Sequence, residues 1–187
     1  MLLVVDCCIR GGVSATRKYY EAYLKTAAEH DVSVIKLAEL DIEPLNAETL
    51  RKRDELCEKK EFDHETFRMA RQFRDADEIL IAAPFWDLSF PSLLKVYLEQ
   101  VSVCGLTFRY EDDGSCVGCC RAKRLLYFST CGGYFGERHL GFEYVKAFAA
   151  MLGIKECVPY IIEGMDIDPA WRQDILDRTV RRLRHGC

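Results

Sequence analysis

The residues best suited to bind a small molecule lie in three loops, each of which follows an apolar run. The first loop, CCIRGGVSATR at 7–17, contains two adjacent glycines and the hydroxyls of Ser14 and Thr16. The glycines permit a tight turn, and the hydroxyls stand where the free N–H groups of a helix N-terminus would point at an anion. We interpret this loop as a phosphate cradle, although the same two residues could be ordinary helix caps. The loop patterns GxGxxG and GK[ST], which bind dinucleotides and nucleoside triphosphates, are both absent.

The second loop places large aromatic side chains at the end of a strand. It reads PFWDL at 84–88 and follows the apolar run EILIAA. Phe85 and Trp86 offer a flat apolar wall against which a planar heteroaromatic ring could lie, and the backbone N–H groups beside them could bind the edge of that ring. The alternative is an aromatic corner buried in the core.

The third loop, TCGGY at 130–134, adds two glycines beside an aromatic residue. The missing side chains let backbone N–H groups approach a ligand closely, unless the loop is a plain glycine turn. A phosphate cradle, an aromatic wall and glycine N–H groups together fit a phosphorylated planar cofactor, and FMN fits best. The predicted cofactor-binding residues are Cys8, Arg10, Ser14, Ala15, Thr16, Pro84, Phe85, Trp86, Asp87, Leu88, Thr130, Cys131, Gly132, Gly133 and Tyr134.

Apolar strands and amphipathic helices alternate along the chain, and this alternation predicts the fold. We expect strands at 2–6, 32–37, 78–84, 124–130 and 154–164, and a short extended piece at 106–115. We expect helices at 14–30, over 47–76 with a break at Asp63 and with Leu50 facing inward, from Pro91 to near Gly105, at 139–152, and from Asp168 onward. This pattern is typical of a single α/β domain, 1–187, whose parallel sheet has helices on both faces. The three loops would then converge at the carboxyl ends of the strands.

The composition limits the classes of function. The 187 residues are 49% hydrophobic and 30% charged, and the formal net charge is −4. This charge argues against a nucleic-acid partner. No apolar run approaches the roughly 20 residues of a membrane helix, and the N-terminus lacks the pattern of a signal peptide. We therefore expect a cytoplasmic globular protein that acts on a small molecule.

Ten cysteines raise the alternative of thiol or metal chemistry. Three of them lie in CVGCC at 116–120. A metal site usually needs four ligands and this segment supplies three, so no metal is predicted. Without a secretion signal, the thiols are expected to be reduced and mostly buried as small hydrophobic groups. Cys131 lies at the proposed ligand edge, where a redox-sensitive thiol is one interpretation, and a small packing residue is the favoured one.

The sequence resembles a known family of enzymes. The segment APFWDLSFPSLLKVYLEQVSVCGLTFRYEDDG at 83–114 is similar to the P-M-Y-N-F loop, the P-x-x-L-K-x-Y helix and the G-x-T-F-R-Y stretch of the flavodoxin-like NAD(P)H:quinone reductases, and specifically of the FMN-dependent NADH-azoreductases. Ser14-Ala15-Thr16 matches the S-x-S/T cradle of that family, and Gly132-Gly133 matches its glycine pair after the fourth strand. The resemblance covers nearly the whole chain.

The resemblance implies a flavodoxin-like fold with strand order 2-1-3-4-5 and a homodimer with FMN near its interface. It also implies a two-electron, ping-pong reduction of quinones or azo compounds by NADH or NADPH, in which the flavin carries the chemistry and no side chain is catalytic. Cys8, Asp87, Leu88 and Thr130 stand where the family usually has Ser, Asn, Phe and Ser. A carboxylate at Asp87 would disfavour negative charge on the ring unless it points to solvent.

Two other interpretations stay open. A flavodoxin-like electron carrier would have a strongly acidic docking face and a T-x-T-G-x-T cradle, and neither the net charge nor VSATRK at 13–18 matches. An iron–sulfur or thiol redox module would depend on the cysteine cluster. Arg138 and His139 follow the third loop, where a solvent-facing helix end is the favoured interpretation.

Overall fold

Five parallel strands form the central sheet of the protein, which is described by a computed structural model over residues 1–26, 31–168 and 170–185. The strands are β1 (Leu2–Asp6), β2 (Val32–Lys36), β3 (Glu78–Ala82), β6 (Arg124–Thr130) and β7 (Glu156–Ile162). Their order across the sheet is β2-β1-β3-β6-β7. Among these five strands this is the predicted order 2-1-3-4-5, so the predicted α/β, flavodoxin-like arrangement is confirmed.

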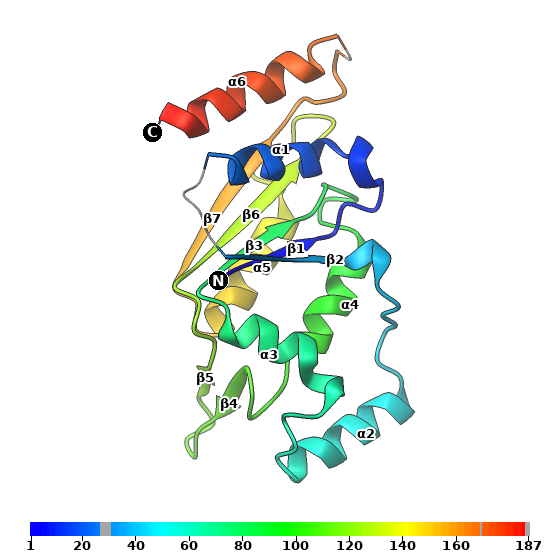
Figure 1. Cartoon of the computed structure of the whole chain (residues 1–187), viewed down its shortest axis with the longest axis vertical. Helices are drawn as coiled ribbons and strands as arrows, with labels where there is room; N and C mark the ends of the chain where they lie inside the picture. Colours follow the sequence, from blue (N-terminus) through cyan, green and yellow to red (C-terminus); the bar gives the residue numbers. More distant parts are fainter. Residues whose placement is uncertain (27–30, 169, 186–187) are drawn as a thin grey trace.

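Helices cover both faces of the sheet (Figure 1). Side chains of α3 (Arg68–Asp75), α4 (Ser92–Val101) and α5 (Leu140–Met151) pack on one face, against Leu3 and Val5 of β1. Side chains of α1 (Ala15–Leu24) and α6 (Arg172–His185) pack on the other, against Leu2 and Val4. Successive side chains of a strand point to opposite faces, so an apolar run such as LLVV is what a strand buried on both faces requires.

The helix ends differ from the prediction in three places, one of which is the start of the last helix, expected at Asp168 and found at Arg172. The helix expected at 14–30 begins at Ala15 with Ser14 as its N-cap, but it ends at Leu24, and 27–30 lie outside the described residues. The helix expected to run from Pro91 to near Gly105 ends at Val101, because Ser102 leaves helical geometry with ψ 90°. Pro159 is tolerated inside β7 because β7 is an edge strand of the sheet.

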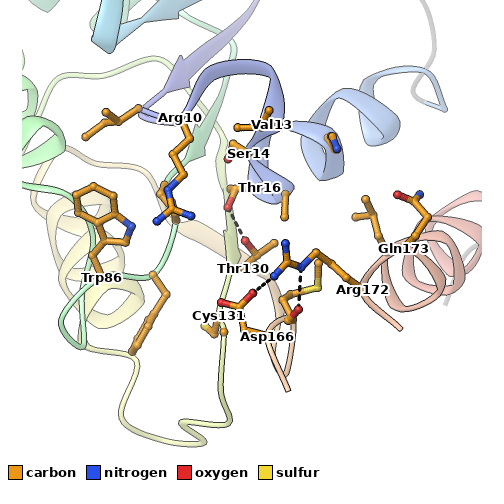
Figure 2. Close-up of a pocket in the computed structure, with 18 residues that line it drawn as sticks. Arg10, Val13, Ser14, Thr16, Trp86, Thr130, Cys131, Asp166, Arg172 and Gln173 are labelled. Atoms are coloured by element: carbon orange, nitrogen blue, oxygen red, sulfur yellow. Dashed lines mark hydrogen bonds and ion pairs between the residues drawn. The ribbon is translucent and has the colours of Figure 1, made fainter. Parts of the chain in front are cut away.

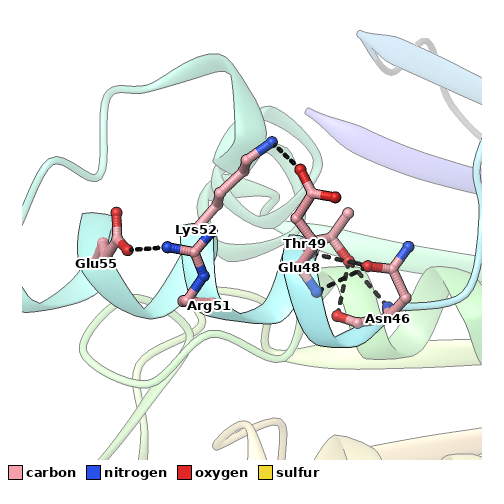
Figure 3. A network of polar contacts seen from close by, with 6 residues as sticks. All are labelled: Asn46, Glu48, Thr49, Arg51, Lys52 and Glu55. Atoms are coloured by element: carbon pink, nitrogen blue, oxygen red, sulfur yellow. Dashed lines mark hydrogen bonds and ion pairs between the residues drawn. The ribbon is translucent and has the colours of Figure 1, made fainter.

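The predicted helical segment 47–76 forms two helices, of which only the second reaches the sheet. α2 (Ala47–Glu58) projects from the body of the molecule, and Leu50, expected to face inward, is 45% exposed. Asn46 and Thr49 form a capping box at its start, and the i,i+4 ion pairs Lys52–Glu48 and Arg51–Glu55 line its surface (Figure 3). Such pairs and caps support a helix that has little tertiary packing.

A small hairpin lies outside the main sheet. β4 (Phe108–Tyr110) pairs antiparallel with β5 (Cys116–Gly118), around a turn in which Gly114 has φ 81°. The first strand and the turn were predicted, whereas the second strand was not. No helix in the described part of the chain is long and apolar enough to cross a membrane.

Candidate functional site

A cavity of about 360 Å³ opens where β1, β3 and β6 end. Figure 2 shows the three predicted loops around it, together with side chains from the segment after β7. A second hollow of about 430 Å³ shares Phe85, Trp86 and Gly132 with the first. The predicted residues that line one or both are Arg10, Ser14, Ala15, Thr16, Pro84, Phe85, Trp86, Asp87, Leu88, Thr130, Cys131, Gly132 and Gly133.

The first and third loops are joined by their hydroxyls. Thr16 is fully buried in the first turn of α1, and its Oγ1 lies 2.7 Å from Oγ1 of Thr130 at the end of β6. Ser14 caps α1 and accepts a hydrogen bond from the backbone N–H of Arg17 at 3.4 Å. The N-terminus of α1, with its unpaired N–H groups, therefore opens directly into the cavity beside two hydroxyls.

A buried carboxylate lies beneath this cradle. Asp6 is fully buried at the end of β1, pairs with Arg17 Nε at 2.6 Å and accepts a hydrogen bond from the Tyr20 hydroxyl at 2.9 Å. Asp6 also accepts the backbone N–H of Cys8 at 2.7 Å. The side chain of Cys8 is fully buried and is not part of the cavity wall, and burial raises its pKa far above the ordinary range.

Charge at the cavity is positive where the cradle opens. Asp6 neutralises Arg17, but Arg10 and Lys18, which line the cavity, have no acidic partner in the described part of the chain. Arg10 lies between Trp86 and the cradle in Figure 2. Two unpaired cations beside a helix N-terminus favour an anionic ligand such as a phosphate.

The aromatic wall sits on a tight two-residue turn. Trp86 and Ser89 exchange backbone hydrogen bonds of 3.1 and 2.7 Å, and the two residues between them, Asp87 and Leu88, have φ 49° and 67°. Positive φ at both central positions is a feature of type I′ hairpin turns and is rare for leucine, so this loop holds a strained backbone. The side chain of Asp87 is exposed, which is the orientation in which its charge would least affect a ring on the wall.

The third loop is fixed by the segment after β7. Met165 N–H donates to Cys131 O at 3.0 Å, and Asp166 N–H donates to Gly132 O at 2.9 Å. A Cβ on Gly132 would lie 2.5 Å from Oδ2 of Asp166 and would displace that side chain, whereas a Cβ on Gly133 would meet only Phe135, at 3.7 Å. Within the described chain, the N–H groups of these two glycines donate to no other residue and stay available for a ligand.

Several site residues were not predicted from the sequence. The wall of the first cavity is completed by residues from the end of β7 to the second turn of α6: Met165, Asp166, Arg172, Gln173 and Leu176. Arg172 pairs with Asp166 and donates to Met165 O at 3.0 Å (Figure 2). No motif marks these residues in the sequence, and they reach the site only because β7 and α6 pack beside β6 and α1.

Two aromatic positions near the third loop differ from expectation. Tyr134 is 70% exposed and lines neither hollow, because its ring packs over Gly164. The expectation of a solvent-facing position for His139 is wrong: this side chain is only 6% exposed and lies edge-on against Phe85, with 4.8 Å between ring centroids.

The cysteines do not form a cluster of ligands. Cys116 is exposed on β5, Cys119 Sγ lies 3.5 Å from the Arg109 guanidinium, and Cys120 Sγ lies 3.8 Å from Thr107 O. No three His, Cys, Asp or Glu side chains of the described residues are grouped so that they could hold a metal. Cys131 is fully buried, and burial raises the pKa of its thiol to about 12, which disfavours the reactive thiolate.

Comparison with known proteins gives a consistent result. A family described as having a flavodoxin-like fold matches residues 1–186. An FMN-dependent NADH:quinone oxidoreductase of Clostridium perfringens is 32% identical over 80% of this chain and 76% of its own length. A second such protein, from Clostridium acetobutylicum, is 34% identical over 65% of this chain, and the match spans 63% of that relative, less than two thirds of its length.

The fold also agrees with a solved structure. An FMN-dependent NADH-azoreductase from Bacillus anthracis, determined in complex with FMN, superposes with a TM-score of 0.80 over 98% of this chain and 95% of its own, at 18% identity. At this identity the likeness shows the fold alone. The match over nearly the whole chain and the identity with the clostridial relatives together show that the protein belongs to the family of flavodoxin-like fold that includes the FMN-dependent NADH:quinone oxidoreductases.

Proposed function

We propose that the chain is a single FMN-binding domain, 1–187, that uses NADH or NADPH to reduce quinones or azo compounds by two electrons. The observation that carries the proposal is the place of the cavity, at the carboxyl ends of β1, β3 and β6. In a flavodoxin-like sheet, this crevice beside the junction of β1 and β3 is where FMN binds. The names of the relatives, which give FMN, NADH and quinone, support the same reaction.

The chemistry of the lining residues fits the two parts of FMN. The N-terminal N–H groups of α1, the hydroxyls of Ser14 and Thr16, and the unpaired Arg10 and Lys18 suit a phosphate dianion. At the other end, the open space at Gly133 and the exposed Trp86 suit a planar ring. We assign the phosphate to the cavity beside the first loop and the ring to the adjoining hollow.

FMN, when bound, supplies the two-electron chemistry between a reduced nicotinamide and the acceptor. The residues of the chain then bind, orient and stabilise charge. The free N–H groups of Gly132 and Gly133 would donate to the polar edge of the ring and stabilise negative charge there. Asp87 lines the hollow assigned to the ring, but its side chain is exposed, so water weakens the effect of its charge on the ring.

We also propose that the protein is a cytoplasmic homodimer. The support is the exposure of apolar side chains beside the site, Trp86 at 39% and Leu88 at 41%, next to Ile9 at 43%. Burying such side chains against a second copy would remove them from water. Light scattering after size-exclusion chromatography should give twice the monomer mass of 21.5 kDa. A monomer at micromolar concentration would contradict the dimer.

The reaction is tested by loading the apoprotein with FMN and following its visible spectrum. We expect one FMN per chain, bleaching of the flavin absorption on addition of NADH without oxygen, and recovery of the absorption on addition of a quinone. A protein that takes up no FMN would refute the proposal. FMN uptake without bleaching by NADH or NADPH would instead favour an electron carrier.

A further inference from the structure

A buried histidine stands directly behind the aromatic wall. His139 is 6% exposed at the N-cap of α5, and its Nδ1 accepts the backbone N–H of Phe142 at 3.1 Å. Its Nε2 lies 3.4 Å from Oγ of Ser129. The ring meets Phe85 edge-on, and Phe85 in turn packs on Phe135 with 4.1 Å between ring centroids.

These contacts close the third loop on itself. The chain leaves β6 after Thr130 and returns at His139 to Ser129 of the same strand, so the contact joins the two ends of the intervening loop. Glu163 holds the middle of that loop by accepting the N–H groups of Phe135 and Gly136 at 3.1 and 3.0 Å. His139 lines neither hollow, but the rings that it supports, Phe85 and Phe135, both line the second hollow, to which the flavin ring is assigned.

We propose that His139 is a positioning residue for the flavin wall: its neutral imidazole closes the third loop against Phe85, and its protonation loosens this closure and weakens flavin binding. The inference rests on the proposed binding of FMN and adds a pH dependence to it.

The hydrogen bonds of His139 explain why a proton would loosen the loop. Because Nδ1 accepts the N–H of Phe142, it has no room for a proton of its own without losing this cap. Burial also disfavours the charged ring and lowers the pKa of His139 below its ordinary value of 6.5. The other titratable groups around it are Glu163 beyond β7, which partly opposes the shift, Tyr127 on β6, and the exposed Arg138 and Glu143 on its own segment.

The sign of the effect follows from proton uptake. In an opened loop His139 regains its ordinary pKa of 6.5. Below that pH, opening of the loop is therefore accompanied by uptake of a proton by His139. The closed loop, and with it the affinity for FMN, should therefore be fully present above pH 6.5 and weaken as pH falls below that value, by up to about tenfold per pH unit.

The test is the dissociation constant of FMN between about pH 5 and pH 8 for three proteins. His139→Asn keeps a good N-cap but cannot titrate. His64→Asn is the matched control, because His64 also caps a turn, accepting Thr66 N–H at 3.2 Å, but is exposed and lies outside both hollows. The FMN phosphate titrates near pH 6 in all three proteins and so cancels in the comparison.

We expect wild type and His64→Asn to lose affinity below pH 6.5 more steeply than His139→Asn, by up to about tenfold per pH unit. A second readout needs no variant: by linkage, FMN must lower the pKa of His139, measured by NMR of the imidazole in free and loaded wild type. Equal pH slopes, or a His139 pKa that FMN does not change, would overturn this inference and leave FMN binding intact. An apoprotein that binds no FMN at any pH would overturn both.

Discussion

The two adjacent glycines of the third loop have different surroundings. At Gly132 the protein itself occupies the space, because Asp166 Oδ2 lies 2.5 Å from the place of a Cβ. At Gly133 the nearest atoms belong to the Phe135 ring, at 3.7 Å, and the space in front is the hollow assigned to the flavin ring. A substitution at Gly132 therefore displaces the Asp166 side chain, whereas one at Gly133 enters the space assigned to the ligand.

We predict that Gly133→Val abolishes FMN retention with little loss of stability. The β-branched side chain would fill the hollow, so the affinity should fall by about 100-fold or more, which corresponds to about 2.8 kcal/mol. The melting temperature of the apoprotein should change by less than about 2 °C. Gly132→Ala is the control and should lower the melting temperature by displacing Asp166 from its pair with Arg172. Normal FMN retention in Gly133→Val would refute the assigned ring position.

Most loop residues of the site could be predicted from the sequence. Glycine turns and helix caps depend on residues that are close in the sequence, so a pattern of glycines and hydroxyls directly after a strand reveals them. Cys8 and Tyr134 could not be excluded from the site, because the contacts that turn them away from it join distant segments: Cys8 Sγ donates to Ala82 O at 3.9 Å, and the Tyr134 ring packs on Gly164. His139 was misjudged for a related reason: a histidine at a helix start is usually exposed, and only the return of the loop to Ser129 buries it.

At the scale of elements, α2 has one buried side chain, Arg53, while its Leu56 and Cys57 pack partly buried against the core. Arg53 is 8% exposed and donates to the backbone carbonyls of Glu99, at 2.9 Å, and Ser102, where α4 ends. Arg53 forms no ion pair within the described part of the chain, and its two hydrogen bonds cap the C-terminus of α4 and tie α2 to it. Carbonyl groups at a helix C-terminus favour a cation.

We predict that Arg53→Met lowers the free energy of unfolding by about 1–3 kcal/mol, because it leaves two carbonyl groups at the end of α4 without a donor. Arg51→Met in the same helix is the control, since Arg51 only forms the exposed pair with Glu55, and should cost less than about 0.5 kcal/mol. Urea unfolding of the two variants measures the difference. Equal effects would show that α2 is not held through Arg53.

The elements themselves were largely predictable, and their ends and orientations were not. Runs such as EILIA at 78–82 and RLLYFST at 124–130 are buried on both faces, so their composition alone predicts parallel strands. The segment CVG of β5 is too short and too mixed to show a period, and its pairing with β4 depends on the turn at Gly114. Leu50 fits an inward helical stripe, but α2 has no sheet beneath it.

For the whole molecule, the site exists because the strand order brings three separated loops together. β1, β3 and β6 are neighbours in the sheet although residues 6, 82 and 130 lie far apart in the sequence.

The cysteines, in contrast, do not gather at one site. Cys7 and Cys131 are buried, and burial raises the pKa of each thiol to about 12, whereas Cys104 and Cys116 are exposed.

We predict that the native protein shows two classes of cysteine. Alkylation near neutral pH, mapped by mass spectrometry, should label Cys104 and Cys116 first and Cys131 more than about 100-fold more slowly, because a buried thiol has almost no thiolate. In urea, all cysteines should be alkylated at similar rates. Rapid labelling of Cys131 in the folded protein would favour the thiol-based alternative over chemistry carried by a bound flavin.

The most direct measurement is an amide NMR map of the apoprotein titrated with FMN. Binding at the carboxyl ends of β1, β3 and β6 predicts that the shifted signals belong to residues 9–18, 85–88 and 130–136, and that the β4–β5 hairpin and α2 are unaffected. Saturation at one FMN per chain with this pattern would establish the site. Shifts confined to other elements, or none at all, would contradict it.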